Sequence, residues 1–579
     1  MDKICTRCKT EFTITENDTI FYQKISVPPP TLCPNCRCAR RMVHRNERNL
    51  YKRKCDVTGK DIISIYRADC PYTVCDKEYY FSDSFDPFAY GVAYNPDLTF
   101  FEQFYAFAKK VPMSSLFIQT SENCEYNQDM SGALNCYLCS RTHDSTNMFY
   151  TYRGNKSSDC IDCFQVVEAS EFLYECVNSS NSSNSQFLHS CDKCSDSSFL
   201  YNCVGCIDCF MCTDQRGKQC YYKNQQYSRE EYKKILDSYN LSTYEGQQRA
   251  LAEFEAFLKK FPRKNLNVIR SDNVSGDGIF DSKDCNNVFN VRTTENCSYI
   301  WDSMRYKDSM DAYSGASVEL VYEATATTNH SSNCHFCVRI YKGSRDCEYS
   351  WFLRNCSNCF GCVSLKDKEY CIFNIQYSKE EYFSILEQIK SKMIADGEYG
   401  EFFPFYTSPF PYNDTVAQEY FPLDKKSAVD HGLQWGEMEE KKHQTTMTAL
   451  ELPDAIADVT DAILRETIAC EHDGECAHGC TKAFRIVADE LAYYRRKGIP
   501  LPKKCPNCRY YRRLEYRNPT RLRDIVCMCR GAEMANGVYK NTVAHAHGDS
   551  PCGENVQTTI KEEGGFIIYC DQCYKKEVF

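Results

Sequence analysis

Residues 135–150 read NCYLCSRTHDSTNMFY, and the spacing of residue types in this stretch decides the fold. Asn135 leads a small residue and then an aromatic one, and Asn147 leads a similar group at the end of the same stretch. The same signature extends outward on both sides at a 12-residue period. Its lead positions are Asn123, Asn135, Asn147, Asp159, Glu171, Asn184, Asp196 and Asp208. A fixed period of this kind is typical of a stacked, quasi-one-dimensional fold.

A second array of the signature follows residue 280 with looser spacing. Its lead positions are Asp284, Asn296, Asp308, Glu319, Asn333, Asp346 and Asn358. Small and aromatic residues alternate in each segment, which indicates short strands between polar turns. We therefore predict a mainly β protein with two arrays of a parallel β-helix-like solenoid and a few capping helices. We expect two 12-residue halves per turn, because a single 12-residue turn has a narrow core for Phe, Tyr and Leu.

Helix signals interrupt and follow the arrays. Ser228 and Ser378 each precede a glutamate by three residues, at Glu231 and Glu381, which is the capping-box pattern of a helix start. Residues 243–261 carry an amphipathic pattern, for which we expect a helix that covers the solenoid. The cysteines inside the arrays are interpreted as small core residues. The run Cys203, Cys206, Cys209 and Cys212 also has the spacing of a metal or iron–sulfur site, and that alternative stays open.

Both ends of the chain carry copies of one cysteine module. Each copy has a CPNC knuckle, at 33–36 and 505–508, and the intervals beyond the knuckle are identical in both copies. Two cysteine pairs separated by about 25 residues match tetrahedral Zn²⁺ with four thiolates. The second pair precedes a basic segment compatible with a helix, as in treble-clef and zinc-ribbon proteins. The predicted ligands of these two structural sites are Cys5, Cys8, Cys33 and Cys36, and Cys476, Cys480, Cys505 and Cys508.

A third zinc site is expected after the second knuckle, with ligands Cys527, Cys552, Cys570 and Cys573. Cys529 is an alternative to Cys527 or Cys552. In the N-terminal copy the matching positions are Cys55, Thr58, Cys75 and Glu78, so we expect that this copy has lost its metal; whether Cys55, Cys70 and Cys75 bind one stays open. Four histidines near the last sites, His472, His478, His545 and His547, are expected to lie at the surface or behind the ligands.

These features divide the chain into seven segments. They are an N-terminal zinc-finger module with a degenerate second site (1–80), a connector (81–120), the first array (121–227), a helical insertion (228–272), the second array (273–377), a helical and linker region (378–469) and a C-terminal double zinc-finger module (470–579). The N-terminal residues show no secretory pattern, and no apolar run reaches the length of a membrane span. With forty cysteines in a chain of 579 residues, we therefore expect reduced thiols and a cytoplasmic location without membrane contact.

The quoted motifs resemble an uncharacterised cysteine-rich zinc-ribbon, or treble-clef, family that is common in candidate-phyla bacteria. The resemblance rests on the CPNCR knuckle with its following arginines, on NIQYSKEEY at 374–382, on YGEFFPFYTSPFPYNDTVAQEYFPL at 399–423 and on the terminal YCDQCYKKEVF. It covers nearly the whole chain and implies zinc binding, but no established activity. The chain departs from the family pattern by the residues inserted at 530–551, inside the last zinc site.

Charge suggests a partner for the ends of the chain. Residues 33–60 carry a net charge of about +7 and residues 482–523 about +10, although the whole chain carries −10. We expect a non-catalytic scaffold whose basic ends contact nucleic acid, either RNA or the ribosome. The predicted contact residues are Arg40, Arg41, Arg45, Arg512, Arg513 and Arg517. The same charges are also compatible with a basic face that folds against an acidic solenoid.

An alternative function is binding of a polymer or a protein along the lateral face of the solenoid, with zinc purely structural. No nucleophile motif, P-loop, dinucleotide fingerprint or HExxH motif occurs in the sequence. All predicted metal sites are filled by protein ligands, which leaves no open position for chemistry. We therefore expect neither catalysis nor a small-molecule substrate.

Overall fold

The computed structural model describes residues 1–124, 126–167, 170–174, 176–437, 443–476 and 478–578. The chain packs into two compact units, each built from segments that are distant in sequence. Unit 1 contains residues 1–116, 266–437 and 520–522, and unit 2 contains residues 117–265, 438–519 and 523–579. The fold is mainly β with several helices, and most strands lie in parallel sheets. No described helix is long and apolar enough to cross a membrane.

The large sheet of unit 2 is parallel except at its last strand pair. Neighbouring strands are one 12-residue repeat apart, as in Tyr152↔Phe164 and Ser198↔Phe210, with a step longer by one at Phe164↔Val177. Its strands are β7 (Ile118–Gln119), β8 (Gln128–Ser131), β9 (Ser140–His143), β10 (Tyr152–Asn155), β11 (Phe164–Val167), β12 (Glu171–Tyr174), β13 (Val177–Ser180), β14 (Ser183–His189), β15 (Ser198–Tyr201), β16 (Ile207–Thr213), β17 (Gln219–Tyr222) and β18 (Gln225–Gln226).

The large sheet of unit 1 is also parallel except at its last strand pair. Its strands pair in parallel at nearly the same interval, which varies by one in either direction, as in Asp272↔Lys283, Cys285↔Cys297 and Glu319↔Ser332. They are β20 (Val268–Ile269), β21 (Asp272–Phe280), β22 (Lys283–Arg292), β23 (Glu295–Thr325), β24 (Ser332–Val338), β25 (Arg345–Glu348), β26 (Ser357–Phe360), β27 (Glu369–Ile372) and the antiparallel β28 (Ile375–Gln376).

The backbone explains how strands only one repeat apart can pair. Every third residue has a positive φ, for example Asn135 at 53° and Leu138 at 51°. The residue after each of these two is a buried cysteine, Cys136 or Cys139. Asn and Asp tolerate the left-handed conformation better than most residues, which accounts for their recurrence at the lead positions. Asn135 also donates its side-chain amide to Asn147 at 3.2 Å, as one step of a side-chain ladder.

The expectation of two 12-residue halves per turn is wrong. Strands pair with the segment one repeat away, so each step of the sheet takes a single repeat. The narrow core of unit 1 is filled mainly by Cys, Val, Ile and Ala, and most large aromatic residues lie outside it. In unit 1, Cys285, Val288 and Val291 belong to one buried cluster, while Phe289 and Trp301 pack with residues of helix α2 (Pro34–Met42).

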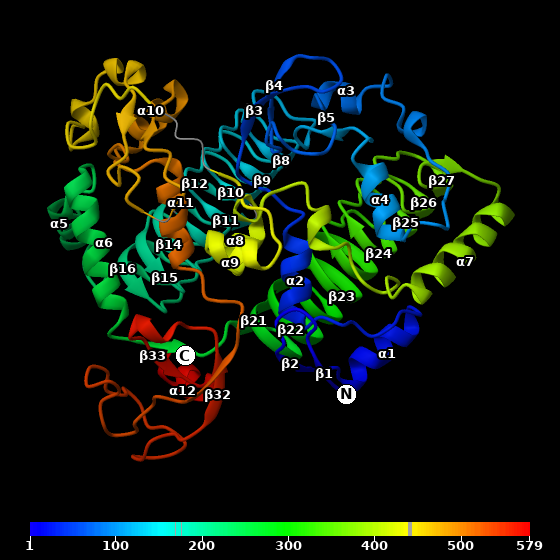
Figure 1. Ribbon diagram of the computed structural model, residues 1–579. Helices are drawn as coiled ribbons and strands as arrows, with labels where there is room; N and C mark the ends of the chain where they lie inside the picture. Colours follow the sequence, from blue (N-terminus) through cyan, green and yellow to red (C-terminus); the bar gives the residue numbers. More distant parts are fainter. Residues whose placement is uncertain (125, 168–169, 175, 438–442, 477, 579) are drawn as a thin grey trace. The chain divides into compact units, whose positions relative to one another are not determined.

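The α-helices described in unit 1 are α1 (Glu16–Lys24), α2, α3 (Lys77–Phe81), α4 (Phe100–Ala108), α7 (Lys379–Ala395), α8 (Val416–Tyr420) and α9 (Lys425–Asp430). In unit 2 they are α5 (Arg229–Tyr239), α6 (Tyr244–Leu258), α10 (Ala488–Lys497), α11 (Pro506–Glu515) and α12 (Asp571–Val578). Several helices of each unit contact its large sheet, among them α2 and α7 in unit 1 and α5, α6 and α11 in unit 2. Figure 1 shows α2 across β23, which it contacts, and α6 beside β15 and β16. Helices α5 and α7 begin with capping boxes at Ser228 and Ser378, as predicted.

Short strand pairs build the cysteine modules. In unit 1 they are β1 (Asp2–Ile4) with β2 (Glu11–Thr13), β3 (Tyr51–Lys54) with β4 (Asp61–Ser64), and β5 (Val74–Cys75) with β6 (Met113–Ser114). In unit 2 they are β29 (Ile468–Ala469) with β30 (Ala483–Phe484), β31 (Arg523–Val526) with β32 (Asn555–Thr558), and β19 (Pro262–Lys264) with β33 (Ile567–Tyr569).

Candidate metal centres and their docking helices

The N-terminal module brings together the four cysteines expected there. The Sγ atoms of Cys5, Cys8, Cys33 and Cys36 all lie within 4.8 Å of one another. The Cys8 and Cys33 sulfurs are 3.7 Å apart, close to the roughly 3.8 Å that separates two thiolates of a tetrahedral zinc site with bonds of about 2.3 Å. Cys33 is the N-cap of α2, so the second pair lies at the positive end of a helix, which favours thiolates. The donor set and its spacing fit structural Zn²⁺.

The second knuckle has a different fourth sulfur from the predicted one. Cys480, Cys505 and Cys508 group with Cys470 and not with the predicted Cys476. The Cys470 and Cys508 sulfurs are 3.8 Å apart, and Cys505 and Cys480 are 3.9 Å apart. Cys505 is the N-cap of α11, as Cys33 is of α2.

Strand positions explain this correction. Cys470 directly follows β29, which pairs with β30, as Cys5 directly follows β1, which pairs with β2. The loop between these strands is seven residues longer in the C-terminal copy, since Cys470 and Cys480 are ten apart and Cys5 and Cys8 are three apart. Cys476 lies in the added segment, and its sulfur is 3.6 Å from that of Cys508. The apolar residue before each strand-end cysteine was the signal that could have identified Cys470.

The last site assembles the four cysteines expected there, Cys527, Cys552, Cys570 and Cys573, within the same 4.8 Å limit. The hairpin β31–β32 positions the first two, and a bond of 2.8 Å from the Cys527 amide to the Glu554 carbonyl closes it. Cys570 directly precedes α12, and its amide donates to the Cys527 sulfur at 3.1 Å. Cys529 lies in a neighbouring group with two histidines and Cys573.

The matching positions of the N-terminal module do not form such a group among the described residues. The Cys55 sulfur accepts the backbone amides of Thr58 and Asp76, each at 3.2 Å. The Cys70 thiol lies 3.4 Å from the Pro409 carbonyl, and the Cys75 thiol lies 3.6 Å from the Met113 carbonyl. Hydrogen bonds to carbonyls are typical of neutral thiols, whereas the Cys55 sulfur accepts two amides. The expected loss of metal in this copy stays a prediction.

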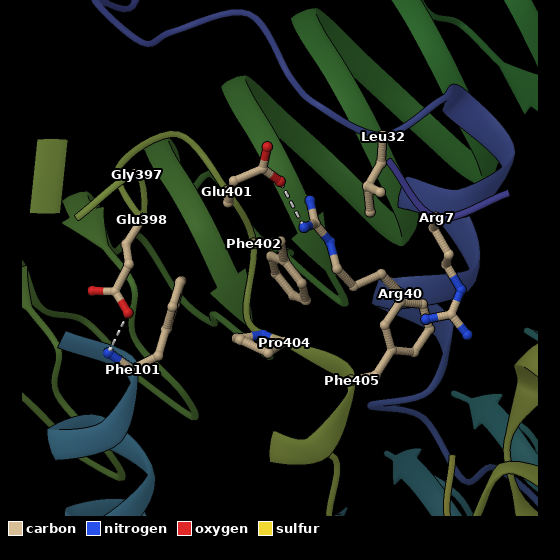
Figure 2. A pocket seen from close by; sticks show the side chains of 10 residues that line it. All are labelled: Arg7, Leu32, Arg40, Phe101, Gly397, Glu398, Glu401, Phe402, Pro404 and Phe405. Atoms are coloured by element: carbon tan, nitrogen blue, oxygen red, sulfur yellow. Dashed lines mark hydrogen bonds and ion pairs between the residues drawn. The ribbon is translucent and has the colours of Figure 1, made fainter. Parts of the chain in front are cut away.

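The helix that starts at each knuckle ends in buried arginines. In unit 1, the Arg37 and Arg41 guanidiniums both reach Asp311, at 2.9 and 3.1 Å. Arg40 and Arg41 contact Glu323 at 3.0 and 2.8 Å. Arg40 also pairs with Glu401 at 2.7 Å, as Figure 2 shows. Asp311 and Glu323 belong to β23, and Glu401 follows α7. Three guanidiniums therefore balance three carboxylates.

Unit 2 repeats this arrangement. Arg509 and Arg513 of α11 occupy the positions of Arg37 and Arg41, and both reach one aspartate, Asp162, at 2.8 and 3.4 Å. Asp162 and Asp311 are both buried and both have positive φ. The Arg509 guanidinium also lies over the Tyr150 ring, 4.5 Å from its centroid. Each of these two helices thus directs arginines four residues apart at one aspartate.

These contacts change the interpretation of the basic segments. Arg40, Arg41, Arg45 and Arg513, all predicted to contact nucleic acid, are at most 5% exposed. Arg45 pairs with Glu47 at 2.6 Å. A guanidinium that is buried against a carboxylate cannot reach a phosphate without breaking that pair. Arg512 and Arg517 are half-buried. Folding of the basic face against carboxylates of the same unit, the other interpretation of the charge pattern, matches the observed pairs.

The pocket in Figure 2 lies next to this cluster, between α2 and the segment after α7. Its acidic groups already have structural partners. Glu401 binds Arg40 and the Thr31 amide, and Glu398 accepts the amides of Phe100 and Phe101 at the start of α4. Phe402, Phe405 and Leu32 supply apolar walls. These contacts hold the segment after α7 against α2 and α4.

The cysteines of the two arrays are buried. Cys203, Cys206, Cys209 and Cys212 are each fully shielded from solvent, and their thiols lie 3.3–3.7 Å from backbone carbonyls two residues earlier. Within the described residues, no group suited to a metal ion includes them. Their surroundings fit small core residues.

Comparisons with known proteins add little to this geometry. No family model matches the chain. No curated protein matches it either. One solved structure, a "putative acetyltransferase from Desulfovibrio desulfuricans G20", is 10% identical over 48% of this chain and 81% of that one, with a TM-score of 0.10. This likeness carries no argument about fold or function.

Proposed function

We propose that the protein is a non-catalytic, zinc-dependent scaffold in which zinc-ribbon modules of the treble-clef type cover two β-solenoids with a 12-residue repeat. The observation that carries the proposal is the position of α2 and α11. Each helix begins at two cysteines of a four-thiolate group and continues into arginines buried against carboxylates of a parallel sheet. Zinc then fixes the start of the helix, and the helix covers the aromatic residues of the sheet.

The chemistry of the sites supports a structural role for the metal. A site with four thiolates is closed, because tetrahedral zinc has no position left for a substrate. Zinc supplies binding free energy that becomes folding free energy, since the ligands converge only in the folded chain. The neighbouring Cys36 thiol lowers the pKa of Cys33 to about 5, and Cys470 lowers that of Cys505 to about 4. The N-cap position of Cys33 and Cys505 agrees with this direction, because the N-terminus of a helix favours a thiolate.

As the partner, we favour a protein or polymer bound along the lateral face of a solenoid. This choice is supported by apolar side chains exposed on the first turns of unit 2. Tyr126, Leu134 and Leu138 are 36–38% exposed, and Tyr126 and Leu138 occupy equivalent positions of consecutive repeats. Nucleic acid is the weaker candidate, because four of its six predicted contact residues are buried in ion pairs.

Metal removal tests the structural part of the proposal. All three tryptophans, Trp301, Trp351 and Trp435, belong to unit 1. A strong chelator should therefore release zinc together with a red shift of tryptophan emission, because Trp301 packs with residues of α2 and is 4% exposed. Zinc release without any change of emission would show that the metal does not hold α2 on the sheet.

Salt-dependent binding tests the choice of partner. Titration of RNA or DNA at low salt should give no specific complex if the arginines are used internally. Affinity that falls steeply with the logarithm of salt concentration would instead restore the nucleic-acid function. Replacement of Leu138 with Glu should weaken a lateral-face partner and leave zinc content unchanged.

A further inference from the structure

The C-terminal module has ligand-type residues that the four-cysteine sites do not use. The segment inserted at 530–551 carries His545 and His547, and Cys529 immediately precedes it. The structure places these three residues beside Cys573, with all four ligand atoms within 4.8 Å of one another. Cys573 is also a member of the last four-cysteine group. Two candidate sites therefore share one sulfur.

The distances match a metal site with two sulfur and two nitrogen ligands. The Cys529 sulfur is 3.7 Å from His545 Nδ1 and 3.4 Å from His547 Nε2. The Cys573 sulfur is 3.4 Å from the same His547 Nε2. Tetrahedral zinc with bonds of about 2.3 Å to sulfur and 2.0–2.1 Å to nitrogen separates S and N by about 3.6 Å.

The hydrogen bonds on the far side of each ring fix its tautomer. His545 Nε2 is 2.7 Å from a Glu577 carboxylate oxygen, and the side chains of this pair are 2% and 0% exposed. His547 Nδ1 is 2.7 Å from the Ser550 carbonyl oxygen. Both partners only accept hydrogen bonds, so these ring nitrogens carry the protons. The lone pairs of His545 Nδ1 and His547 Nε2 then face the same two sulfurs. Metal-binding histidines typically have such an acceptor behind them.

The surroundings of Cys529 are those of a ligand thiolate. The residue is fully buried, and the Asn541 side-chain amide points at its sulfur from 3.1 Å. Asn541 is itself held by the Tyr569 hydroxyl at 2.7 Å. An N–H donor at this position stabilises a negative sulfur. The insertion therefore supplies two ligands and the group that orients a third.

We propose that Cys529, His545, His547 and Cys573 bind a second Zn²⁺ that shares the Cys573 thiolate with the ion of the four-cysteine site. The last site is then a binuclear centre with five thiolates and two neutral imidazoles. Two sulfur and two nitrogen donors in a tetrahedral arrangement favour zinc among the common divalent metals. The second ion also reduces the net charge of the centre from −2, for one zinc with four thiolates, to −1.

The site at the second knuckle shows the same relation between an insertion and a shared cysteine. Its added segment brings His472, Cys476 and His478 next to Cys508, which also belongs to the adjacent four-cysteine group. The N-terminal module lacks both insertions, and among its described residues only the single four-cysteine group is found. The binuclear arrangement is thus associated with residues that one copy of the module gained.

The inference rests on the zinc sites of the proposed function, and metal counting separates the two. Native mass spectrometry of the full chain would count ions in the wild type, in C529S/H547Q and in a variant with residues 528–551 replaced by Asp-Val. The second variant restores the short spacing of the N-terminal copy and retains the four-cysteine ligands. H431A, at an exposed histidine, is the control. We expect both ligand variants to bind one ion fewer than the wild type and the control.

Cadmium NMR provides the second readout. Protein loaded with ¹¹³Cd should show two resonances coupled to each other through the shared Cys573 sulfur, and both variants should lose one of them. Equal ion counts in the wild type and in both variants, or the absence of a coupled pair, would overturn the binuclear centre alone. A wild-type chain that binds no metal would overturn the proposed function as well.

Discussion

The Glu323→Gln substitution tests whether the buried arginine cluster holds the N-terminal module on its sheet. The change retains the shape of the side chain and removes one negative charge. Glu323 is fully buried and contacts Arg40 at 3.0 Å and Arg41 at 2.8 Å, with Arg37 at 3.8 Å. The variant leaves three guanidiniums with two carboxylates, Asp311 and Glu401.

The expected cost follows from this imbalance. Removal of one partner from a buried ion pair destabilises a protein by about 3–5 kcal/mol, because a charge remains without compensation in a poorly solvated site. With a urea m value of about 3 kcal/mol/M, the midpoint of unfolding should fall by about 1–1.7 M. Tryptophan fluorescence measures this transition selectively, since all three tryptophans lie in unit 1.

Asp308→Asn is the matched control in the same unit. Asp308 pairs with Lys24 at 3.3 Å, but the Lys24 side chain is 48% exposed. Exposed pairs contribute about 0–1 kcal/mol, so this midpoint should move by less than about 0.3 M. If the two variants shift the midpoint equally, the buried cluster does not hold the module and our account of the basic segments is wrong.

Four further outcomes are expected. Asp162→Asn should destabilise unit 2 by a similar amount of about 3–5 kcal/mol, detected by circular dichroism. The unfolding midpoint measured by tryptophan emission, which reports unit 1, should not change. Cys359→Leu should cost about 1–3 kcal/mol in thermal unfolding because it overfills the narrow core, whereas Cys359→Ala should cost less. Cys470→Ser should impair the four-cysteine site of the second knuckle, measured as faster zinc release to a chromogenic chelator, and Cys476→Ser should leave that site's release rate unchanged. Burial, with a smaller effect of Arg40, lowers the pKa of His44 to about 3. In the unfolded chain its pKa is about 6.5, so stability should be lost as pH falls from about 6.5 towards 3, by up to about 4–5 kcal/mol. His44→Phe should flatten this part of the plot of urea midpoint against pH relative to the wild type.

Much of the local structure could be predicted from spacing alone. Most lead positions of the repeat, such as Asn135 and Asn147, are left-handed, whereas at Glu171 and Glu319 the next residue is the left-handed one. Parallel strands pair at 12-residue steps. The capping boxes at Ser228 and Ser378 lie where the pattern placed them. Such features are local, because they depend on backbone conformation and on neighbours a few residues away.

The width of each turn was predicted incorrectly for a physical reason. Phe, Tyr and Leu were expected in the interior of the solenoid because apolar residues are usually buried. In unit 1 the interior cluster consists mainly of Cys, Val, Ile and Ala, with Leu353, Leu365 and Tyr306 as larger members. Other aromatic residues are buried against a covering helix instead. Trp301, for example, packs with Met42 and Val43 at the end of α2.

The sequence by itself predicted the 12-residue interval, the two knuckles and most of the cysteines that gather in the candidate metal sites, because each depends on residue type at a fixed interval. Only the tertiary structure decided which module packs on which sheet. The N-terminal module belongs with the second array, and the C-terminal module with the first. Complementary charges, such as Arg41 with Glu323 and Arg509 with Asp162, meet although their segments are far apart along the chain. No local interval encodes such a pair, since it forms only when burial removes both charges from water and makes their contact necessary.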